Sequence, residues 1–191
     1  VVLLPNPGYP VFEVGAYLGG AELYFYELRE ENDFLPKFDE IPEDIARRAK
    51  YIMVSYPYNP VCAVAPASFY EELIAYAKKY NIIVVHDNAY SDIIYDGVRG
   101  GSFLEFPGAK EVGIECFSLS KSFNLTGARV SFIIGNREII DAVKLLRSQY
   151  DFGIFEPIQR AAIAALEGPL EPVREQCARY QERRDALCGG L

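Results

Sequence analysis

The stretch Ile82-Ile83-Val84-Val85-His86-Asp87 decides the fold class of this 191-residue chain. Its four aliphatic residues predict a strand that is apolar throughout, which is typical of a strand buried on both faces of a parallel sheet. Two polar residues follow at once and mark its carboxyl end. The clearest helix of the sequence precedes it at residues 67–80, where Phe69, Leu73, Ile74 and Ala77 recur at helical spacing.

The same alternation of strand and helix extends in both directions from this stretch. We expect strands at residues 1–4, 21–28, 51–55, 82–85, 114–119 and 130–134. We expect helices at residues 11–18, within 38–49, and at 67–80, 137–149, 156–167 and 170–187. The alternation predicts an α/β fold of three layers, α/β/α, with helices on both sides of a mostly parallel sheet.

Composition argues against several classes of function. The net charge of −8 at pH 7 is opposite to the basic face that nucleic-acid binding needs. No apolar run reaches the length of a membrane span, so we expect no membrane partner. The four cysteines lack CxxC spacing and the chain has one histidine, so we expect free thiols, no metal site and a cytoplasmic protein.

Polar and aromatic side chains follow several of the expected strands. In open parallel sheets the ligand lies beyond the carboxyl ends of the strands. Residues 6–9, 56–59, 87–90 and 118–121 occupy such positions and come from distant parts of the sequence. We therefore expect them to meet at one edge of the sheet.

Lys121 is the most informative residue of these segments. It ends an apolar run, and Arg129 follows eight positions later. A lysine there is either an ordinary surface residue or an amine that condenses with an aldehyde to a Schiff base. Arg129 is correspondingly either solvated or a bidentate clamp for a phosphate, to which Ser118 and Ser120 would add hydroxyl donors.

Asp87 stands where a carboxylate is costly without a partner. It is either a cap or turn residue, or an anion that faces the protonated nitrogen of a bound pyridine ring. In the second case the pairing would keep the nitrogen protonated, since opposite charges about 4 Å apart gain roughly 4 kcal/mol at an effective dielectric constant near 20. Tyr90 is either a core tyrosine or a hydrogen-bond donor to an oxygen on that ring. Asn59 is either a turn residue or a second donor to the same oxygen. Tyr9 is placed to stack on a flat cofactor. We expect His86 to point away from the aspartate side and to be packed or surface-exposed, not catalytic.

Taken together, these motifs resemble the class I/II aminotransferases, which are fold type I enzymes dependent on pyridoxal 5'-phosphate. The resemblance covers essentially the whole chain and rests on Asn6-Pro7-Gly8-Tyr9-Pro10, Asn59-Pro60, Asp87-Asn88-Ala89-Tyr90, and Ser118-Leu119-Ser120-Lys121 through Gly127-Ala128-Arg129. Tyr150-Asp151-Phe152-Gly153-Ile154-Phe155 is similar to the branch that contains LL-diaminopimelate aminotransferases.

The resemblance implies a role for each candidate residue. Lys121 would be the catalytic residue, bonding to the cofactor aldehyde and then moving the proton of the substrate Cα. Asp87 would pair with the pyridinium nitrogen. The other cofactor-binding residues would hydrogen-bond the ring 3'-oxygen (Asn59, Tyr90), stack on the ring (Tyr9) and bind the phosphate (Ser118, Ser120, Arg129).

Some features depart from the family pattern. Val61-Cys62 stands where Thr-Gly is usual, and Ser131 where a glycine is common. On the resemblance, residues 1–191 are the central part of the cofactor-binding large domain of a longer protein. Its N-terminal segment and C-terminal small domain, which carries the arginine for the substrate carboxylate, would lie outside the chain. Family members are usually homodimers.

The function expected from this resemblance is transfer of an amino group from an amino acid to a 2-oxo acid. Two alternatives stay open. The same fold and cofactor also support β-lyases and racemases. The chain by itself could also be an inactive fragment that binds the cofactor or forms a dimer.

Overall fold

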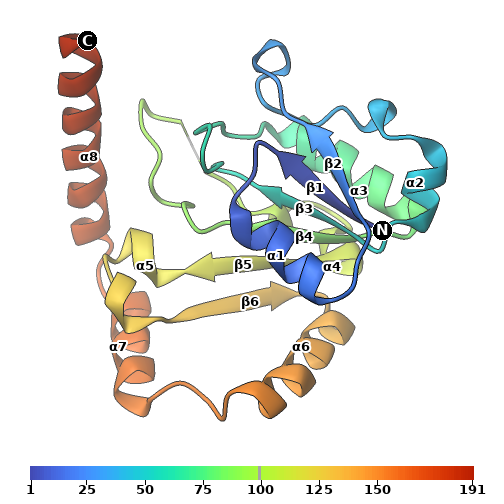
Figure 1. Cartoon of the computed structure of the whole chain (residues 1–191). Coiled ribbons are helices and arrows are strands. Elements are labelled where there is room, and N and C mark those ends of the chain that lie inside the picture. The colour runs from blue at the N-terminus through green and yellow to red at the C-terminus, as the bar shows by residue number, and fades with distance from the viewer. Residues whose placement is uncertain (99) are drawn as a thin grey trace.

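The computed structural model describes residues 1–98 and 100–191. Its centre is a six-stranded sheet with the strand order β2-β1-β3-β4-β5-β6 (Figure 1). The strands are β1 (Val2–Asn6), β2 (Leu23–Glu27), β3 (Tyr51–Ser55), β4 (Ile83–Asp87), β5 (Gly113–Ser118) and β6 (Ser131–Gly135). All neighbouring pairs are parallel except β5 and β6, which are antiparallel. The expected α/β fold with a mostly parallel sheet is confirmed.

The helices also follow the expected order. The longer ones are α1 (Pro10–Leu18), α2 (Glu43–Arg48), α3 (Ala67–Tyr80), α6 (Arg137–Tyr150), α7 (Glu156–Glu167) and α8 (Glu171–Gly190). Short turns that periodicity did not indicate are α4 (Ala109–Val112), α5 (Leu119–Ser122), η1 (Glu30–Asn32), η2 (Phe38–Glu40), η3 (Phe103–Glu105) and η4 (Thr126–Ala128). Within the described residues, no helix combines the length and the apolar character that crossing a membrane requires.

The sheet packs on both faces because successive strand residues point to opposite sides. On one face Leu3, Ile52 and Val84 join the larger core, together with Leu73 and Ala77 of α3. On the other face Val2 and Leu4 pack against Phe12 and Ala16 of α1. Figure 1 shows α1 on one side of the sheet and α2 and α3 on the other. Helices thus lie on both sides of the sheet, as predicted.

One expectation about β4 needs correction. The strand was expected to be buried on both faces, yet Ile83 is 38% exposed. The cluster under α1 reaches Tyr51 and Met53 of β3 but includes no residue of β4. The short helix α1 therefore leaves the β4 part of this face uncovered by the described residues. Val84, on the opposite face, is fully buried as expected.

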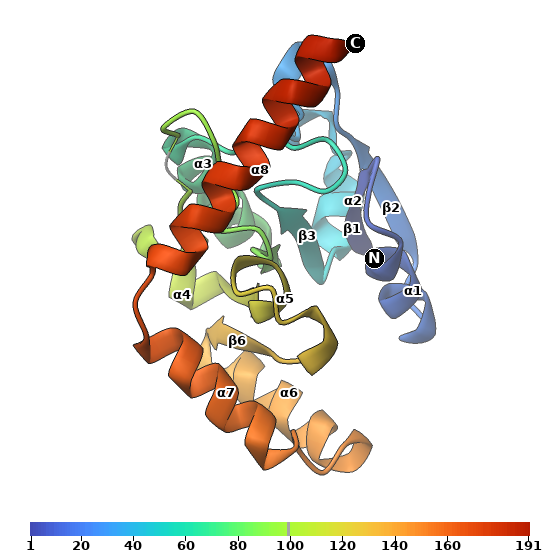
Figure 2. The same cartoon turned by 90° about the vertical axis from the view of Figure 1, so that its left-hand side faces the viewer.

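The C-terminal helices lie beyond the antiparallel edge. Ala162 of α7 packs with Leu119 and Val130 in a third, smaller core. Helix α8 stands apart from the sheet (Figures 1 and 2). Among its described residues only Val173 is buried, so polar contacts hold much of its length.

Candidate functional site

Strands β1, β3, β4 and β5 run parallel and end at one edge of the sheet. Asp87, the last residue of β4, lies opposite Ser55 of β3 and Cys116 of β5. The polar segments that follow these strands come from distant parts of the sequence, and the parallel arrangement gathers them as the sequence predicts. The edge carries most of the candidate residues.

Lys121 and Tyr90 approach each other at this edge. Strand β5 ends at Ser118, whose hydroxyl accepts a hydrogen bond from the Ser120 N–H at 3.2 Å and so caps helix α5. This cap turns the chain, and Lys121 Nζ lies 5.6 Å from the centroid of the Tyr90 ring. Lys121 is exposed, and no carboxylate in residues 1–98 or 100–191 forms an ion pair with it. The amine is thus accessible and held over an aromatic face.

Asp87 sits in the turn three residues before Tyr90. One oxygen of its half-buried carboxyl group accepts a hydrogen bond from the Ala89 N–H at 3.2 Å. Burial raises the pKa of Asp87, although the Ala89 hydrogen bond and nearby His86 act in the other direction. Within the part of the chain that the structure describes, no lysine or arginine pairs with it. A carboxylate in this environment favours a cationic partner.

Asn59 shares a pocket with Tyr90. The pocket has a volume of about 610 Å³, and Asn59, Tyr58, Cys62 and Tyr90 are among its lining residues. The Tyr58 hydroxyl donates to the Pro7 carbonyl at 2.6 Å and ties the loop after β3 to the loop after β1. Asn59 and Tyr90 therefore line the same cavity.

Cys62 occupies a backbone conformation that suits glycine. Its φ is 59°, in the left-handed region, and its N–H donates to the Tyr58 carbonyl at 2.7 Å. The turn thus keeps the conformation that a glycine adopts freely, with a cysteine in it. The thiol contacts the Pro60 carbonyl, with Sγ 3.7 Å from the oxygen.

The other candidates are less closely assembled. Tyr9 is 44% exposed, meets Phe12 edge to face at 5.7 Å, and lines a separate pocket of about 140 Å³. Arg129 is exposed, has a φ of 52°, and donates to the Thr126 carbonyl at 3.1 Å. Ser120 is buried and Ser118 half-buried in the same turn. Among the described residues, no hydrogen bond, ion pair or ring contact joins Tyr9 or Arg129 to Lys121 or Asp87.

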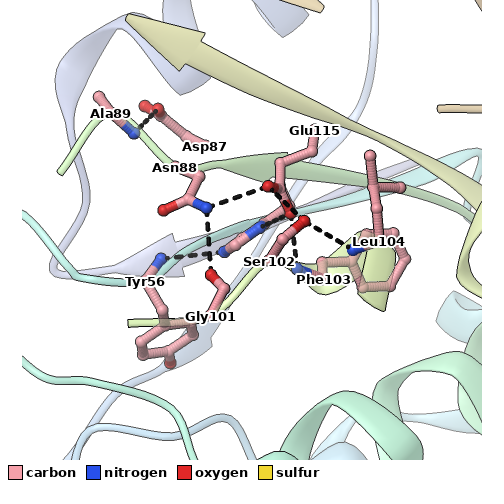
Figure 3. Close-up of polar contacts among 10 residues, drawn as sticks. Tyr56, Asp87, Asn88, Ala89, Gly101, Ser102, Phe103, Leu104 and Glu115 are labelled. Carbon is pink, nitrogen blue, oxygen red and sulfur yellow. Dashed lines mark hydrogen bonds and ion pairs between the residues drawn. The ribbon is translucent and has the colours of Figure 1, made fainter. Parts of the chain in front are cut away.

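Sequence reasoning missed a buried polar cluster beneath this edge (Figure 3). Glu115 of β5 is 0% exposed and accepts hydrogen bonds from His86 Nδ1, Asn88 Nδ2, Ser102 Oγ and the Phe103 N–H. His86 is also 0% exposed, so the expected packed histidine is found. A signal was available, since an acidic residue within an expected buried strand needs a partner.

Contacts from α8 also reach the site and were not foreseen. Gln176 donates to the Lys121 carbonyl at 3.2 Å. Arg184 forms a two-pronged ion pair with Asp96, at 2.5 and 2.8 Å, and lies 5.0 Å from the Tyr95 ring centroid. Helix α8 is thereby fastened to the segment that follows Tyr90.

Comparison with known proteins gives a consistent result. A sequence profile of the family described as Aminotransferase class I and II matches residues 1–191. The LL-diaminopimelate aminotransferase of Moorella thermoacetica is 49% identical over 189 residues, which are 99% of this chain and 48% of that protein. The enzyme of the same name from Dehalococcoides mccartyi is 48% identical over 191 residues, with 100% and 49% covered. The chain spans about half the length of the curated relatives it matches.

Solved structures agree with these relatives. Substrate-bound BacF from Bacillus subtilis superposes with a TM-score of 0.94 at 43% identity, covering 98% of this chain and 48% of that one. A probable N-succinyldiaminopimelate aminotransferase from Thermus thermophilus has a TM-score of 0.91 at 36% identity, with 98% and 51% covered. The similarity extends over nearly the whole chain.

Proposed function

The chain belongs to the aminotransferase class I and II family, whose cofactor is pyridoxal 5'-phosphate, and from this premise we propose that the protein transfers an amino group from an amino acid to a 2-oxo acid. The approach of Lys121 Nζ to within 5.6 Å of the Tyr90 ring centroid carries the proposal. The accessible amine is thus close to Tyr90, which lines one pocket together with Asn59. A lysine in that position can bond to an aldehyde.

The residues around Lys121 fit the cofactor ring. Asp87 is half-buried, has a raised pKa and lacks a basic partner among the described residues, so a protonated ring nitrogen would supply the missing positive charge. Asn59 and Tyr90 would hold the ring oxygen. Tyr9 would stack on the ring, as the family resemblance implies.

The phosphate would lie at the turn after β5. Ser118 and Ser120 occupy that turn, and Arg129 precedes β6, whose first residue, Ser131, lies opposite Ser118 in the sheet. A guanidinium and hydroxyl groups are suitable donors for phosphate oxygens. We assign all three residues to phosphate binding.

When bound, pyridoxal 5'-phosphate withdraws electrons from the substrate Cα and makes its hydrogen acidic. Lys121 would hold the cofactor at its aldehyde and, once the substrate amine has taken that place, move the proton to and from Cα. Asp87 would keep the ring nitrogen protonated. Asn59 and Tyr90 would fix the plane of the ring relative to Lys121.

The substrate is inferred from the names of the relatives. Because relatives at 48–49% identity are LL-diaminopimelate aminotransferases, we propose that LL-diaminopimelate is the amino donor. We further propose that residues 1–191 form the central part of the large domain. In the complete protein, which we place in the cytoplasm as a homodimer, other segments would bind the substrate carboxylate.

Cofactor binding tests the site directly. Purified protein mixed with pyridoxal 5'-phosphate should develop an imine absorbance, and borohydride should fix the label on Lys121, as located by mass spectrometry. Lys121→Ala should abolish this label, whereas Lys144→Ala, which removes an exposed lysine of α6, should retain it. Labelling that persists at full yield in Lys121→Ala would refute the assignment.

Product analysis tests the reaction. LL-diaminopimelate with 2-oxoglutarate should give glutamate in the full-length protein. In a second assay, the substrate is an amino acid with a leaving group at Cβ. Release of ammonia and pyruvate from it would indicate a β-lyase.

A further inference from the structure

The two residues on either side of Asp87 bind the same buried carboxylate. His86 Nδ1 lies 2.8 Å from one oxygen of Glu115, and Asn88 Nδ2 lies 3.0 Å from the other. Because side chains alternate across a strand, these neighbours point to the face opposite Asp87. Figure 3 shows the Asn88 amide turned towards Glu115 and the Asp87 carboxyl group turned towards Ala89.

Glu115 is well suited to hold two neighbours at once. It also accepts from Ser102 Oγ at 2.8 Å and from the Phe103 N–H at 2.6 Å, so four donors surround a carboxylate that is 0% exposed. Burial alone would raise the pKa of Glu115, but the hydrogen bonds from His86, Asn88 and Ser102 together lower it. The group is therefore an anion with fixed partners.

The geometry also fixes the ring of His86. The Tyr56 N–H donates to Nε2 at 3.3 Å, so this nitrogen accepts, and the ring proton lies on Nδ1 facing Glu115. The imidazole of this β4 residue thus links Tyr56, which directly follows β3, to Glu115 of β5. A rotated or flipped ring would lose one of its two partners.

The turn after His86 is fastened on its other side as well. The Asn88 N–H donates to the Cys116 carbonyl at 2.9 Å, and Asn88 Nδ2 also donates to the Gly101 carbonyl at 3.2 Å. Asn88 is 1% exposed. The Asp87 carboxyl group, by contrast, accepts one hydrogen bond, from the Ala89 N–H, among the described residues, so its direction depends on how the neighbouring residues are held.

We propose that Glu115 is a positioning residue, which fixes the direction of Asp87 through the flanking side chains of His86 and Asn88. This inference rests on the proposed function, because Asp87 is taken to face the ring nitrogen of the cofactor. Glu115 itself lies on the opposite face of the sheet and touches neither substrate nor cofactor.

The test separates positioning from general stability. A deaza analogue of pyridoxal 5'-phosphate, with carbon in place of the ring nitrogen, cannot pair with Asp87. The wild-type protein should bind the natural cofactor more tightly than the analogue, as measured by absorbance titration. Asp87→Asn should remove this preference and provides the reference.

Two variants cut the proposed link. Glu115→Gln replaces one acceptor oxygen of residue 115 by an NH2 group, which donates. Asn88→Ala removes the hydrogen bond from the turn to Glu115. We expect the preference for the natural cofactor to fall about tenfold in both variants, which lies within the range of about 5- to 150-fold that the loss of one buried hydrogen-bond partner corresponds to. Ser102→Ala is the control, because it removes the other donor to the Glu115 oxygen that Asn88 binds, while Ser102 lies outside the turn. This variant should keep the wild-type preference.

A second measurement needs no cofactor. The Ala89 N–H is bound to the Asp87 carboxylate, so its amide hydrogen exchange should accelerate in Glu115→Gln and in Asn88→Ala but not in Ser102→Ala. Equal losses of affinity for cofactor and analogue, or unchanged exchange at Ala89 in both linking variants, would overturn the inference. A wild-type protein that binds cofactor and analogue equally would refute the role of Asp87 and the positioning role with it.

Discussion

Replacement of Glu115 by alanine should strongly destabilise the protein. The change removes an acceptor of four hydrogen bonds. Two of the donors keep an alternative: Asn88 Nδ2 retains the Gly101 carbonyl, and the half-buried Ser102 hydroxyl can rotate. His86 Nδ1 and the Phe103 N–H lose the only partners they have among the described residues.

The size of the effect follows from those two donors. Each buried donor left without an acceptor costs about 1–3 kcal/mol, and Glu115→Ala leaves two such donors. We therefore expect the free energy of unfolding to fall by about 4 kcal/mol, a large part of the stability of an ordinary domain. Glu115→Gln keeps one acceptor oxygen and should lose about half as much.

Urea unfolding followed by far-ultraviolet circular dichroism measures this difference. Glu111→Ala is a matched control, because Glu111 forms an exposed ion pair with Lys78 at 2.7 Å, and such pairs contribute at most about 1 kcal/mol. A loss below about 1 kcal/mol in Glu115→Ala, comparable with that of the control, would refute the view that the buried network stabilises the fold.

The free energy of unfolding that Glu115 contributes should depend on pH, and the direction follows from its pKa. The pKa of Glu115 is lowered in the folded protein from an ordinary value of 4.5, so its carboxylate stabilises the fold above that value. This contribution is lost as the pH falls from about 4.5 through the folded pKa. The stability difference between wild type and Glu115→Gln should therefore shrink in that range of pH.

Three further outcomes are expected. Asp87→Asn should raise the melting temperature of the cofactor-free protein at pH 7, because burial raises the pKa of Asp87 and so disfavours its anion. The same change should weaken cofactor binding. A lower melting temperature would contradict this expectation. Burial also raises the pKa of Cys116 from 9.0 to about 11, which makes its thiolate about 100-fold rarer at pH 8. Mass spectrometry should therefore show iodoacetamide labelling the exposed Cys62 and Cys188 before Cys116. Asp96→Ala removes the ion pair to Arg184. It should change the free energy of unfolding by less than about 1 kcal/mol yet accelerate amide hydrogen exchange in α8. Unchanged exchange would show that this ion pair does not hold the helix.

Much of the fold was predictable because its signals are local. The helical spacing of Phe69, Leu73 and Ala77 predicts α3, and all three side chains are buried. The run from Ile82 to Val85 predicts a strand, and the observed strand begins one residue later and ends two residues later, at Asp87. The exposure of Ile83 was not predictable, because it depends on how far the short helix α1 reaches across the sheet.

The candidate site was predictable only in outline. The carboxyl-end rule for parallel strands brings Lys121 and Tyr90 to one edge, and they meet there. The contacts of α8 depend on the path of the chain after β6, which no local pattern records. Arg184 and Gln176 therefore read as ordinary residues of a polar helix until their partners Asp96 and Lys121 are seen.

The pairing of β4 with β5 explains why two carboxylates so close together have opposite properties. His86 lies opposite Glu115, and Asp87 lies opposite Cys116, so one register step separates the two acids and alternation sends them to opposite faces. On one face Glu115 meets four donors and its pKa is lowered; on the other Asp87 meets one backbone donor and a thiol, and its pKa is raised. An anion that is fully hydrogen-bonded stabilises the fold and has little capacity left for a ligand. The less satisfied anion is the one that gains from a cationic ligand, and the same strand pair holds it in place.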